Sequence, residues 1–360
     1  MTVEKKKIAI VVTNLAGSGA EKVSLAQAKL FKENGHDVIL VLLEKLIKYD
    51  IEKFDFPIIS LTKIKNQYKI FGLIGDYIYA YLLKKVIKKN LNKVDIIISN
   101  LPRADRVVSL LKEQKTYFVI HMSYKAELEK FSSRRAKKKL SLYRRIYQDK
   151  NIITVANDIK KDFDILKILY NNIITIYNPF DFSEIRAKGD EKLDVSFNYI
   201  ISPSTFRAQK RYDIMLDAFS LIKSDIKLLI LTKENDTLKQ MIKERNLQQK
   251  VVVAGFKQNP YKYIKNAKLL VLSSDREGLP TVIIESLILG TPVVSTNCPT
   301  GPKEIMKGKL SEWLTPVGEP IELAKTIDRA LKSTIHIEDT LIEKFNKDTI
   351  CKEFVSLWKN

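Results

Sequence analysis

Cysteine is scarce in this chain of 360 residues, and the two that are present, Cys298 and Cys351, stand far apart. Two cysteines cannot form the disulfide framework of a small secreted domain, and their separation does not fit a zinc-binding motif. The histidine, aspartate and glutamate residues show no grouping typical of a divalent-metal site. We therefore expect a protein of the reducing cytoplasm, with no metal and no bound cofactor.

Long apolar runs are absent as well. No stretch reaches eighteen consecutive apolar residues, so we expect no helix that spans a bilayer. Lysines precede an apolar run near the N-terminus, but that run has only the length of a strand and the polar TNLAGSGAEK follows it, which favours a first strand over a signal peptide. Internal repeats and low-complexity segments are also missing.

The chain does have the length and the apolar content for two domains. Its residues are 45% hydrophobic, enough for two separate cores. Short apolar runs alternate with amphipathic stretches, which is the pattern of parallel sheets covered by helices. The runs begin with IAIVV, VILVLL, DIIIS, YFVI, IITV and IITIY, and from Tyr199 the pattern restarts with YIIS, KLLILT, KVVVAG, KLLVLS and PVVS. We predict an α/β protein with Rossmann-like domains at residues 1–180 and 181–341, a linker at 178–192 and a last helix near 342–358.

Basic residues are distributed unevenly. Residues 1–180 contain 34 Lys and Arg against 18 Asp and Glu, a formal charge of +16, whereas residues 181–360 contain 28 against 24, or +4. Residues 134–145, RRAKKKLSLYRR, hold seven bases and no acid. Such a run indicates a polyanionic partner, and we predict an anionic membrane surface. Residues 70–89 predict an apolar, aromatic face with a basic flank, although this spacing is also typical of a core helix and a charge run often marks only a solvated face.

The most informative stretch is SSDREGLPTVIIESLILGTPVVSTNCPTGPKEI, residues 273–305. Glu277 is expected in a loop outside the carboxyl end of a strand, where open α/β sheets bind ligands. The segment from Gly278 to Thr281 also contains Leu279 and Pro280, and its N–H groups would point from the N-terminus of a helix toward an anion. Gly290 is the expected C-cap of that helix.

Glu285 lies eight positions after Glu277, on that helix. Its neighbours three and four positions away are Thr281, Val282, Ile288 and Leu289, so it has no polar face to join. A carboxylate among apolar residues needs hydroxyl or amide partners, and a ribose supplies two adjacent hydroxyls. The alternatives are a Glu that caps a nearby helix or one that reaches solvent.

This segment resembles the E-x7-E signature of GT-B glycosyltransferases of family 4, also called glycosyl transferases group 1. The resemblance implies two Rossmann-like domains facing across a cleft, with the C-terminal helix, 342–360, crossing back onto the first domain. It also implies sugar transfer with retention and without an obligatory metal. In that family the first Glu, here Glu277, contacts the donor sugar and the second, here Glu285, contacts the ribose.

Two positions of the first domain fit the same resemblance. Gly17, Ser18 and Gly19 end the first strand, resemble the family's GGAE loop and would let backbone amides approach a diphosphate or an acceptor. The third glycine of a dinucleotide fingerprint would fall on Lys22, although Glu44 after the second strand keeps NAD as an alternative. His121 follows the strand YFVI and resembles the family's active-site histidine; a satisfied core histidine is the alternative.

In the second domain, SPSTFRAQKRYDIML resembles the family's G-R-L-x-x-x-K loop, with Lys210 in the lysine position to neutralise the leaving diphosphate. The sequence departs from that pattern because Thr205 stands where the family has Arg. Arg207 and Arg211 are the candidates to supply the missing charge. The backbone of Val253, Gly255 and Phe256 is the expected platform for the base.

The sequence thus predicts a cytoplasmic enzyme, held at the inner face of the plasma membrane, that transfers a hexose or N-acetylhexosamine from a UDP-sugar to a lipid-linked or lipooligosaccharide-type glycan acceptor. A UDP-sugar epimerase of the same fold is the alternative. A basic nucleic-acid-binding protein is a distant one, because RNA-binding, zinc and helix-turn-helix signatures are missing.

Overall fold

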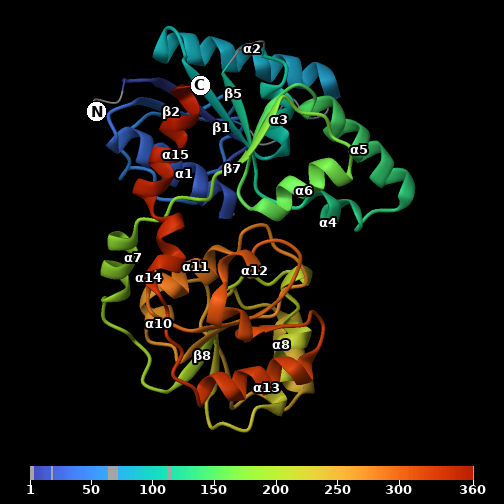
Figure 1. Ribbon diagram of the computed structural model, residues 1–360, viewed down its shortest axis with the longest axis vertical. Helices are drawn as coiled ribbons and strands as arrows, with labels where there is room; N and C mark the ends of the chain where they lie inside the picture. Colours follow the sequence, from blue (N-terminus) through green and yellow to red (C-terminus); the bar gives the residue numbers. More distant parts are fainter. Residues whose placement is uncertain (1–3, 18, 64–71, 112–114, 360) are drawn as a thin grey trace. The chain divides into compact units, whose positions relative to one another are not determined.

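The computed structural model describes residues 4–17, 19–63, 72–111 and 115–359, and the chain divides into two units. The first contains residues 1–180 and 347–360, and the second contains residues 181–346. Each unit is a parallel sheet with helices packed around it (Figure 1). The α/β class and the pair of Rossmann-like sheets expected from the sequence are confirmed.

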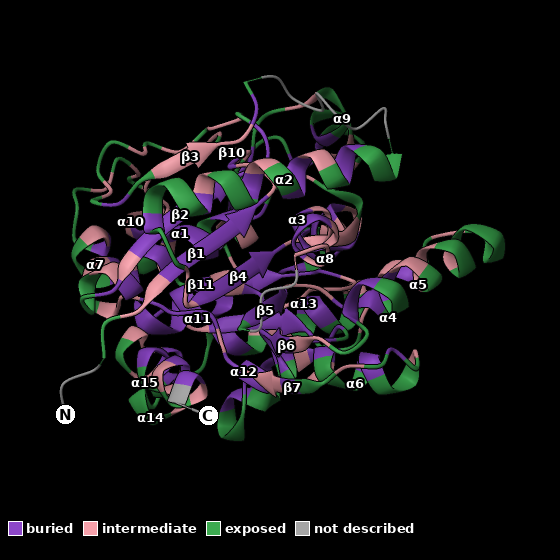
Figure 2. Cartoon of the chain, turned by 90° about the horizontal axis from the view of Figure 1, so that it is seen from above, coloured by how far each residue is buried: buried purple, intermediate pink, exposed green. Residues whose placement is uncertain are grey.

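The first unit is built on a seven-stranded sheet of order β3-β2-β1-β4-β5-β6-β7 within the described residues. Its central strands are apolar and buried on both faces, as strands covered by helices on each side must be (Figure 2). The strands are β1 (Lys7–Val12), β2 (Asp37–Leu42), β3 (Ile58–Ser60), β4 (Ile96–Asn100), β5 (Thr116–Ile120), β6 (Asn151–Thr154) and β7 (Asn172–Thr175). The helices are α1 (Gly19–Glu33), α2 (Gly72–Leu91), α3 (Pro102–Val108), α4 (Tyr124–Leu128), α5 (Ser133–Tyr147), α6 (Asn157–Ile165) and α15 (Lys347–Lys359).

The second unit carries a six-stranded parallel sheet of order β10-β9-β8-β11-β12-β13 within the described residues. Its strands are β8 (Tyr199–Ser202), β9 (Lys227–Ile230), β10 (Val251–Val253), β11 (Leu269–Leu272), β12 (Val293–Thr296) and β13 (Leu314–Thr315). The longer helices are α7 (Phe182–Gly189), α8 (Tyr212–Leu221), α9 (Asp236–Glu244), α11 (Thr281–Ile288) and α13 (Pro320–Leu331). The shorter helical segments are η2 (Ala208–Lys210), α10 (Tyr261–Lys265), α12 (Pro302–Ile305), η3 (Gly308–Trp313), α14 (Asp339–Ile342) and η4 (Glu343–Phe345).

The stretch expected to be a linker at 178–192 is mostly helical, because α7 occupies its middle. The Asp181 side chain caps α7 by accepting a hydrogen bond from the Glu184 amide at 3.0 Å. Gly189 ends the helix where a side chain would not fit, since a Cβ there would lie 2.6 Å from a methyl carbon of Leu289. The stretch expected as a linker thus contains a helix, and α7 belongs to the second unit.

The C-terminal helix begins later than the sequence indicated, at Lys347, after the short turns α14 and η4. Asn346 has an extended backbone that separates η4 from α15. Helix α15 packs on α1 through aromatic contacts: the Phe31 ring centroid lies 5.1 Å from Phe354 and 5.0 Å from Trp358. This aromatic cluster makes the helix part of the first unit.

Candidate active site

Each sheet has a switch point, where the strand order along the sheet reverses. In the second unit β8 lies between β9 and β11, so the loops that follow β8 and β11 leave the sheet on opposite sides of the switch point. A ligand of an open parallel sheet binds outside the carboxyl ends of the strands at this point. The loops concerned are residues 203–211 and 273–280, which contain Lys210 and Glu277 among the residues singled out from the sequence.

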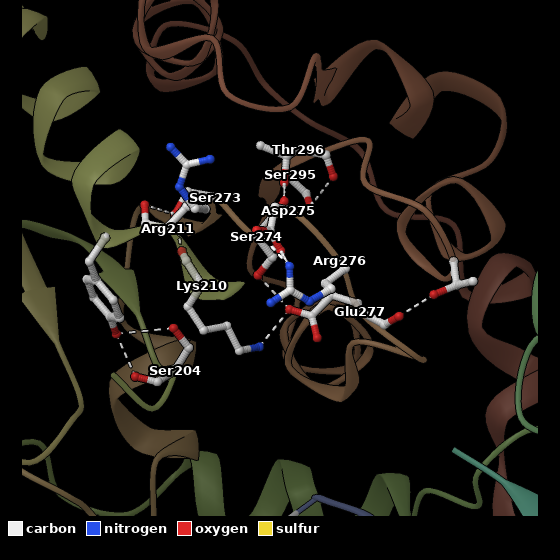
Figure 3. A network of polar contacts seen from close by, with 12 residues as sticks. Ser204, Lys210, Arg211, Ser273, Ser274, Asp275, Arg276, Glu277, Ser295 and Thr296 are labelled. Carbon is white, nitrogen blue, oxygen red and sulfur yellow. Dashed lines mark hydrogen bonds and ion pairs between the residues drawn. The ribbon is translucent and has the colours of Figure 1, made fainter. Parts of the chain in front are cut away.

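A partly buried ion pair joins these two loops. Lys210 Nζ lies 2.6 Å from Glu277 Oε1, and both side chains are largely shielded from solvent, at 14% and 9% exposure (Figure 3). Ser274 Oγ donates a second hydrogen bond to the same carboxylate oxygen at 2.5 Å. Glu277 is therefore not a solvated loop acid, and the switch point holds one cation and one carboxylate in contact.

The loop that carries Lys210 is held from both neighbouring strands. The Phe206 amide donates to Thr232 Oγ1 after β9 at 2.9 Å, and Ser273 Oγ after β11 donates to the Lys210 carbonyl at 2.7 Å. The Asp275 amide donates to the Gln209 carbonyl at 2.9 Å. The protein itself thus fixes the backbone of Lys210, so its ammonium group is positioned at little entropic cost.

Three arginines lie in this loop or in the loop beside it, and two of them form ion pairs with neighbouring carboxylates. Arg211 forks onto Asp213, with Nη2 at 2.6 Å from Oδ2 and Nε at 2.9 Å from Oδ1; this ion pair raises the pKa of Arg211 and lowers the pKa of Asp213. Arg276 Nη1 lies 2.9 Å from Asp275 Oδ1. Arg207, by contrast, is exposed and makes no ion pair with the described residues.

Position 205, where the family pattern has arginine, is also exposed. Phe206 lies between Thr205 and Arg207 in the sequence. Its ring packs against the Tyr212 ring, with the two ring centroids 5.4 Å apart. Since alternate residues of an extended segment point to the same side, Thr205 and Arg207 share the face that Phe206 turns away from. Of the two arginines proposed to replace the missing charge, Arg207 is the one that remains available.

The segment from Gly278 to Thr281 is shaped by a close backbone approach. Leu279 and Pro280 are buried, and helix α11 begins at Thr281. Gly301 has φ +95°, and a Cβ there would overlap Pro280 Cδ and lie 2.8 Å from the Gly278 carbonyl oxygen. Thr300 Oγ1 donates to the Glu277 carbonyl. Only glycine at position 301 lets the β12 loop hold the Glu277 loop in this position.

Glu285 is buried at 3% exposure on α11, which ends at Ile288. The C-cap is Leu289, and Gly290, the residue expected to be the C-cap, follows it with φ +76°. The Tyr261 hydroxyl, from α10, donates to Glu285 Oε1 at 3.4 Å. The carboxylate therefore has a hydroxyl partner within the protein. Tyr261 is a neighbour that the sequence did not indicate, because it lies 24 residues earlier in the chain.

The expected base platform follows β10, at the same carboxyl edge of the sheet. Gly255 adopts φ +77°, and the Phe256 ring next to it is 67% exposed. Val253 ends the strand and is half-buried. An exposed aromatic ring beside a glycine turn offers a stacking face and accessible backbone groups.

In the first unit the corresponding switch point lies between β1 and β4. The Gly17 amide is already used, because it donates to Glu21 Oε2 at 2.6 Å. Gly19 opens α1, and a Cβ there would meet no atom within 4 Å, whereas Ser18 lies outside the described residues. Glu44, the acid considered for a ribose, is buried and pairs with Arg103. These contacts leave Glu44 committed to the protein.

His121 follows β5 and is half-buried at the same edge. Its Nε2 lies 2.7 Å from Oδ1 of Asn100, the last residue of β4. Burial lowers the pKa of His121 to about 4, so the imidazole is neutral near pH 7. The histidine therefore offers a hydrogen-bonding ring and no positive charge at this edge.

The described residues contain no group of three or more His, Cys, Asp or Glu side chains arranged to hold a metal ion. Within the same ranges, no helix is both long enough and apolar enough to cross a bilayer.

Known proteins resemble this chain in both sequence and fold. Residues 183–347 match the family described as glycosyl transferases group 1. The chain is 25% identical over 311 residues to the N-acetylgalactosamine-N,N'-diacetylbacillosaminyl-diphospho-undecaprenol 4-alpha-N-acetylgalactosaminyltransferase of Campylobacter jejuni, covering 83% of each chain. It is 25% identical over 192 residues to the lipopolysaccharide 1,6-galactosyltransferase of Escherichia coli, covering 52% of this chain and 54% of that protein. Among solved structures, that of Anabaena HepE in complex with UDP and glucose superposes with a TM-score of 0.78 at 19% sequence identity. The superposition covers 98% of this chain and 99% of HepE.

The two parallel sheets, each with a switch point, and the similarity to HepE over almost the whole chain define a GT-B fold. The protein is a glycosyltransferase with this fold, and residues 183–347 carry the glycosyl transferases group 1 domain.

Proposed function

We propose that the protein transfers a hexose or N-acetylhexosamine from a UDP-sugar to a lipid-linked or lipooligosaccharide-type glycan acceptor at the cytoplasmic face of the membrane, with retention at the anomeric carbon. The observation that carries this proposal is the Lys210–Glu277 ion pair at the switch point of the second sheet. A diphosphate needs the cation, and a sugar hydroxyl needs the carboxylate as a hydrogen-bond acceptor.

The donor would bind along the carboxyl edge of the second sheet. Phe256 and the backbone of Gly255 would meet the base, Glu285 the ribose, and Lys210 with Arg207 the diphosphate. The presence of UDP and glucose in the HepE complex supports a UDP-sugar. The amides around Thr281 face the same edge and would add to the anion site.

The reaction breaks the bond between the anomeric carbon and the β-phosphate oxygen and forms a bond from that carbon to the acceptor hydroxyl oxygen. The bonding electron pair leaves with the phosphate, where Lys210 stabilises the growing negative charge. The proton of the acceptor hydroxyl passes to an oxygen of the departing phosphate. Neutral His121 would contact a sugar hydroxyl, and no divalent metal is required, so transfer should continue in EDTA.

The acceptor and the membrane belong to the first unit in this proposal. Only Tyr143, Ile146 and Tyr147 of α5 are buried, which leaves the basic residues of 134–145 largely at the surface. Helix α2 buries one face and exposes Leu73, Ile74, Tyr77 and Tyr81 on another, with exposed lysines in its last turns. Residues 70 and 71 of the expected membrane stretch lie outside the described residues. The Campylobacter relative, named for an undecaprenol-linked acceptor, supports a lipid-borne one.

A thermal-shift titration with UDP, GDP and their sugars, followed by a transfer assay on a polyprenyl-diphosphate glycan, tests the proposal. We expect UDP and a UDP-sugar to stabilise the protein, and radiolabelled sugar to appear in the lipid fraction with the anomeric configuration of the donor. Stabilisation by GDP and not by UDP would show that the donor is not a UDP-sugar. Conversion of the UDP-sugar to an epimer in the absence of acceptor would show that the protein is an epimerase and not a transferase.

A further inference from the structure

The amide of Asn100 is half satisfied in the core of the first unit. Asn100 is fully buried at the carboxyl end of β4, and its Oδ1 lies 2.7 Å from His121 Nε2. Its Nδ2 is buried and has no hydrogen-bond partner among the described residues. A buried NH2 group without a partner is costly, and such groups in native proteins are uncommon enough to require an explanation.

The contact with Asn100 determines which nitrogen of His121 carries the proton. An amide oxygen can only accept a hydrogen bond, so His121 Nε2 must donate. Because burial keeps the ring neutral near pH 7, Nδ1 then carries a lone pair. No described residue hydrogen-bonds to His121 Nδ1. The pair therefore presents one unused acceptor, His121 Nδ1, and one unused donor, Asn100 Nδ2.

The place of Asn100 in the sheet gives these two groups a ligand-binding position. Asn100 is in register with Val12 at the end of β1 and with Val119 near the end of β5, so it sits at the carboxyl edge beside the switch point. The next residue, Leu101, has φ +79° although it is not glycine, and it opens α3. Backbone strain of this kind is concentrated at ligand-binding sites, where the surrounding structure maintains it.

We propose that Asn100 is a positioning and substrate-contacting residue: its Oδ1 fixes the tautomer and orientation of His121, and its Nδ2 donates a hydrogen bond to a sugar oxygen. A sugar has both kinds of group that the pair lacks, since one hydroxyl can accept from Asn100 Nδ2 and another can donate to His121 Nδ1. The inference rests on the proposed glycosyl transfer, because it places a sugar at this edge.

The test uses the full-length protein and the variants Asn100→Asp and Asn100→Ala. Asn100→Asp keeps the acceptor for His121 Nε2 but removes the NH2 donor, whereas Asn100→Ala removes both. Asn171→Asp is the matched control, because Asn171 is exposed and its side chain donates to Asn151 at the amino end of β6. Melting temperatures identify any variant that does not fold, and Asn100→Asp, which is nearly isosteric, is the variant most expected to fold.

The first measurement is the tautomer of His121 by long-range 1H–15N NMR, which needs no substrate. We expect the Nε2–H form in the natural protein and in Asn100→Asp, and a mixture of tautomers in Asn100→Ala. A predominant Nδ1–H form in the natural protein would overturn the proposal.

The second measurement separates binding of UDP from transfer. We expect at least a tenfold loss of kcat/KM in Asn100→Asp and a larger loss in Asn100→Ala, with Kd for UDP within twofold of the natural protein because UDP binds the second unit. Transfer within twofold of the natural protein in both variants would also overturn the proposal. If the natural protein neither bound UDP nor transferred sugar, the proposed function would fail instead, and the NMR result would still decide the role of Asn100.

Discussion

Lys210 and Glu277 are 67 residues apart in the sequence, and their side chains meet at 2.6 Å across the switch point of the second sheet. The pair combines the group that attracts a diphosphate with a group that repels it. The carboxylate neutralises the ammonium, and Ser274 holds the carboxylate in place. A bound donor must therefore share Lys210 with Glu277, so the two residues should affect nucleotide affinity in opposite directions.

Lys210→Met and Glu277→Gln test this opposition. Lys210→Met removes the cation and leaves Glu277 largely buried without its partner, so we expect UDP to bind at least tenfold more weakly and transfer to fall by about 10²–10³-fold. Glu277→Gln removes the repulsion, so UDP should bind as tightly as before or more tightly, although transfer still falls. Calorimetric titration with UDP and initial rates of transfer measure the two effects.

Lys325→Met is the control for this pair, because Lys325 makes only an exposed ion pair with Glu322 on α13. Lys325→Met should change neither the affinity for UDP nor the rate of transfer. Equal weakening of UDP binding by Lys210→Met and Glu277→Gln would show that the pair is structural and does not compete with the diphosphate.

Much of this site could be predicted from the sequence, because the signals are local. Glu277, Pro280, Glu285 and Gly290 lie within one strand-loop-helix segment, and their spacing shows where the loop ends and the helix begins. The contacts between segments could not be predicted in this way. The partner of Glu277 and the Asn100–His121 contact depend on which strands are neighbours, and the run of apolar residues in a buried strand does not specify its neighbour.

The elements that the sequence did not indicate are the weakest ones. Strand β3, Ile58–Ser60, is half-buried at the edge of its sheet, and β13, Leu314–Thr315, has two residues. Neither is long enough for an apolar run to stand out from its surroundings. Helix α7 was overlooked for a different reason: its charged residues resemble a linker, and its burial depends on contacts with α10 and α11.

Arg207 should supply the charge that Thr205 does not. We expect Arg207→Gln to weaken UDP binding by about 10–150-fold, the range of one hydrogen bond between charged groups, while uridine binding stays within twofold. Arg211→Gln should have a smaller effect, because Arg211 is already committed to Asp213. Calorimetry with UDP and uridine on each variant distinguishes the two arginines. A larger loss for Arg211→Gln than for Arg207→Gln would reverse the assignment.

Gly301 should be essential for the position of the Glu277 loop. Gly301→Ala combines a strained φ with a Cβ that overlaps Pro280, so we expect a loss of about 2–4 kcal/mol in the free energy of unfolding and weaker binding of the donor. Gly290→Ala is a matched control: Gly290 also has positive φ, but its Cβ would have no atom within 4 Å. Chemical denaturation of both variants separates overlap from backbone strain, and equal losses would remove the role of the Pro280 contact.

The basic face of α5 should bind anionic vesicles. Each base close to such a surface contributes about 1 kcal/mol before screening, so neutralising four should lower partitioning by at least tenfold at low salt. The variant changes Arg134, Arg135, Lys137 and Lys138 to Gln, and sedimentation with phosphatidylglycerol-containing vesicles measures it. Four exposed lysines of the second unit serve as control when changed to Gln: Lys233, Lys239, Lys243 and Lys250. Equal binding of the two variants would place membrane contact elsewhere or exclude it.

A buried carboxyl group under α5 should make stability depend on pH. Asp105 is fully buried and accepts hydrogen bonds from Ser99 at 2.6 Å and from Tyr147 at 2.7 Å. Burial raises the pKa of Asp105 from 3.8 to about 7 in spite of these bonds. Between those values the folded chain keeps a proton that the unfolded chain has lost, so the contribution of Asp105 to the free energy of unfolding decreases as pH rises from about 4 to about 7.

His121 acts in the opposite sense over part of this range. Its folded pKa is lowered from 6.5 to about 4, so its contribution to stability is present above 6.5 and is lost as pH falls toward 4. The effect of Asp105 must therefore be read as a difference between the natural protein and Asp105→Asn, measured by urea denaturation at several pH values. We expect the variant to gain stability relative to the natural protein between pH 4 and pH 7, by roughly 2–4 kcal/mol at most. A difference that does not change with pH would mean that Asp105 titrates outside this window, so that the network with Tyr147 holds the carboxylate in its charged form.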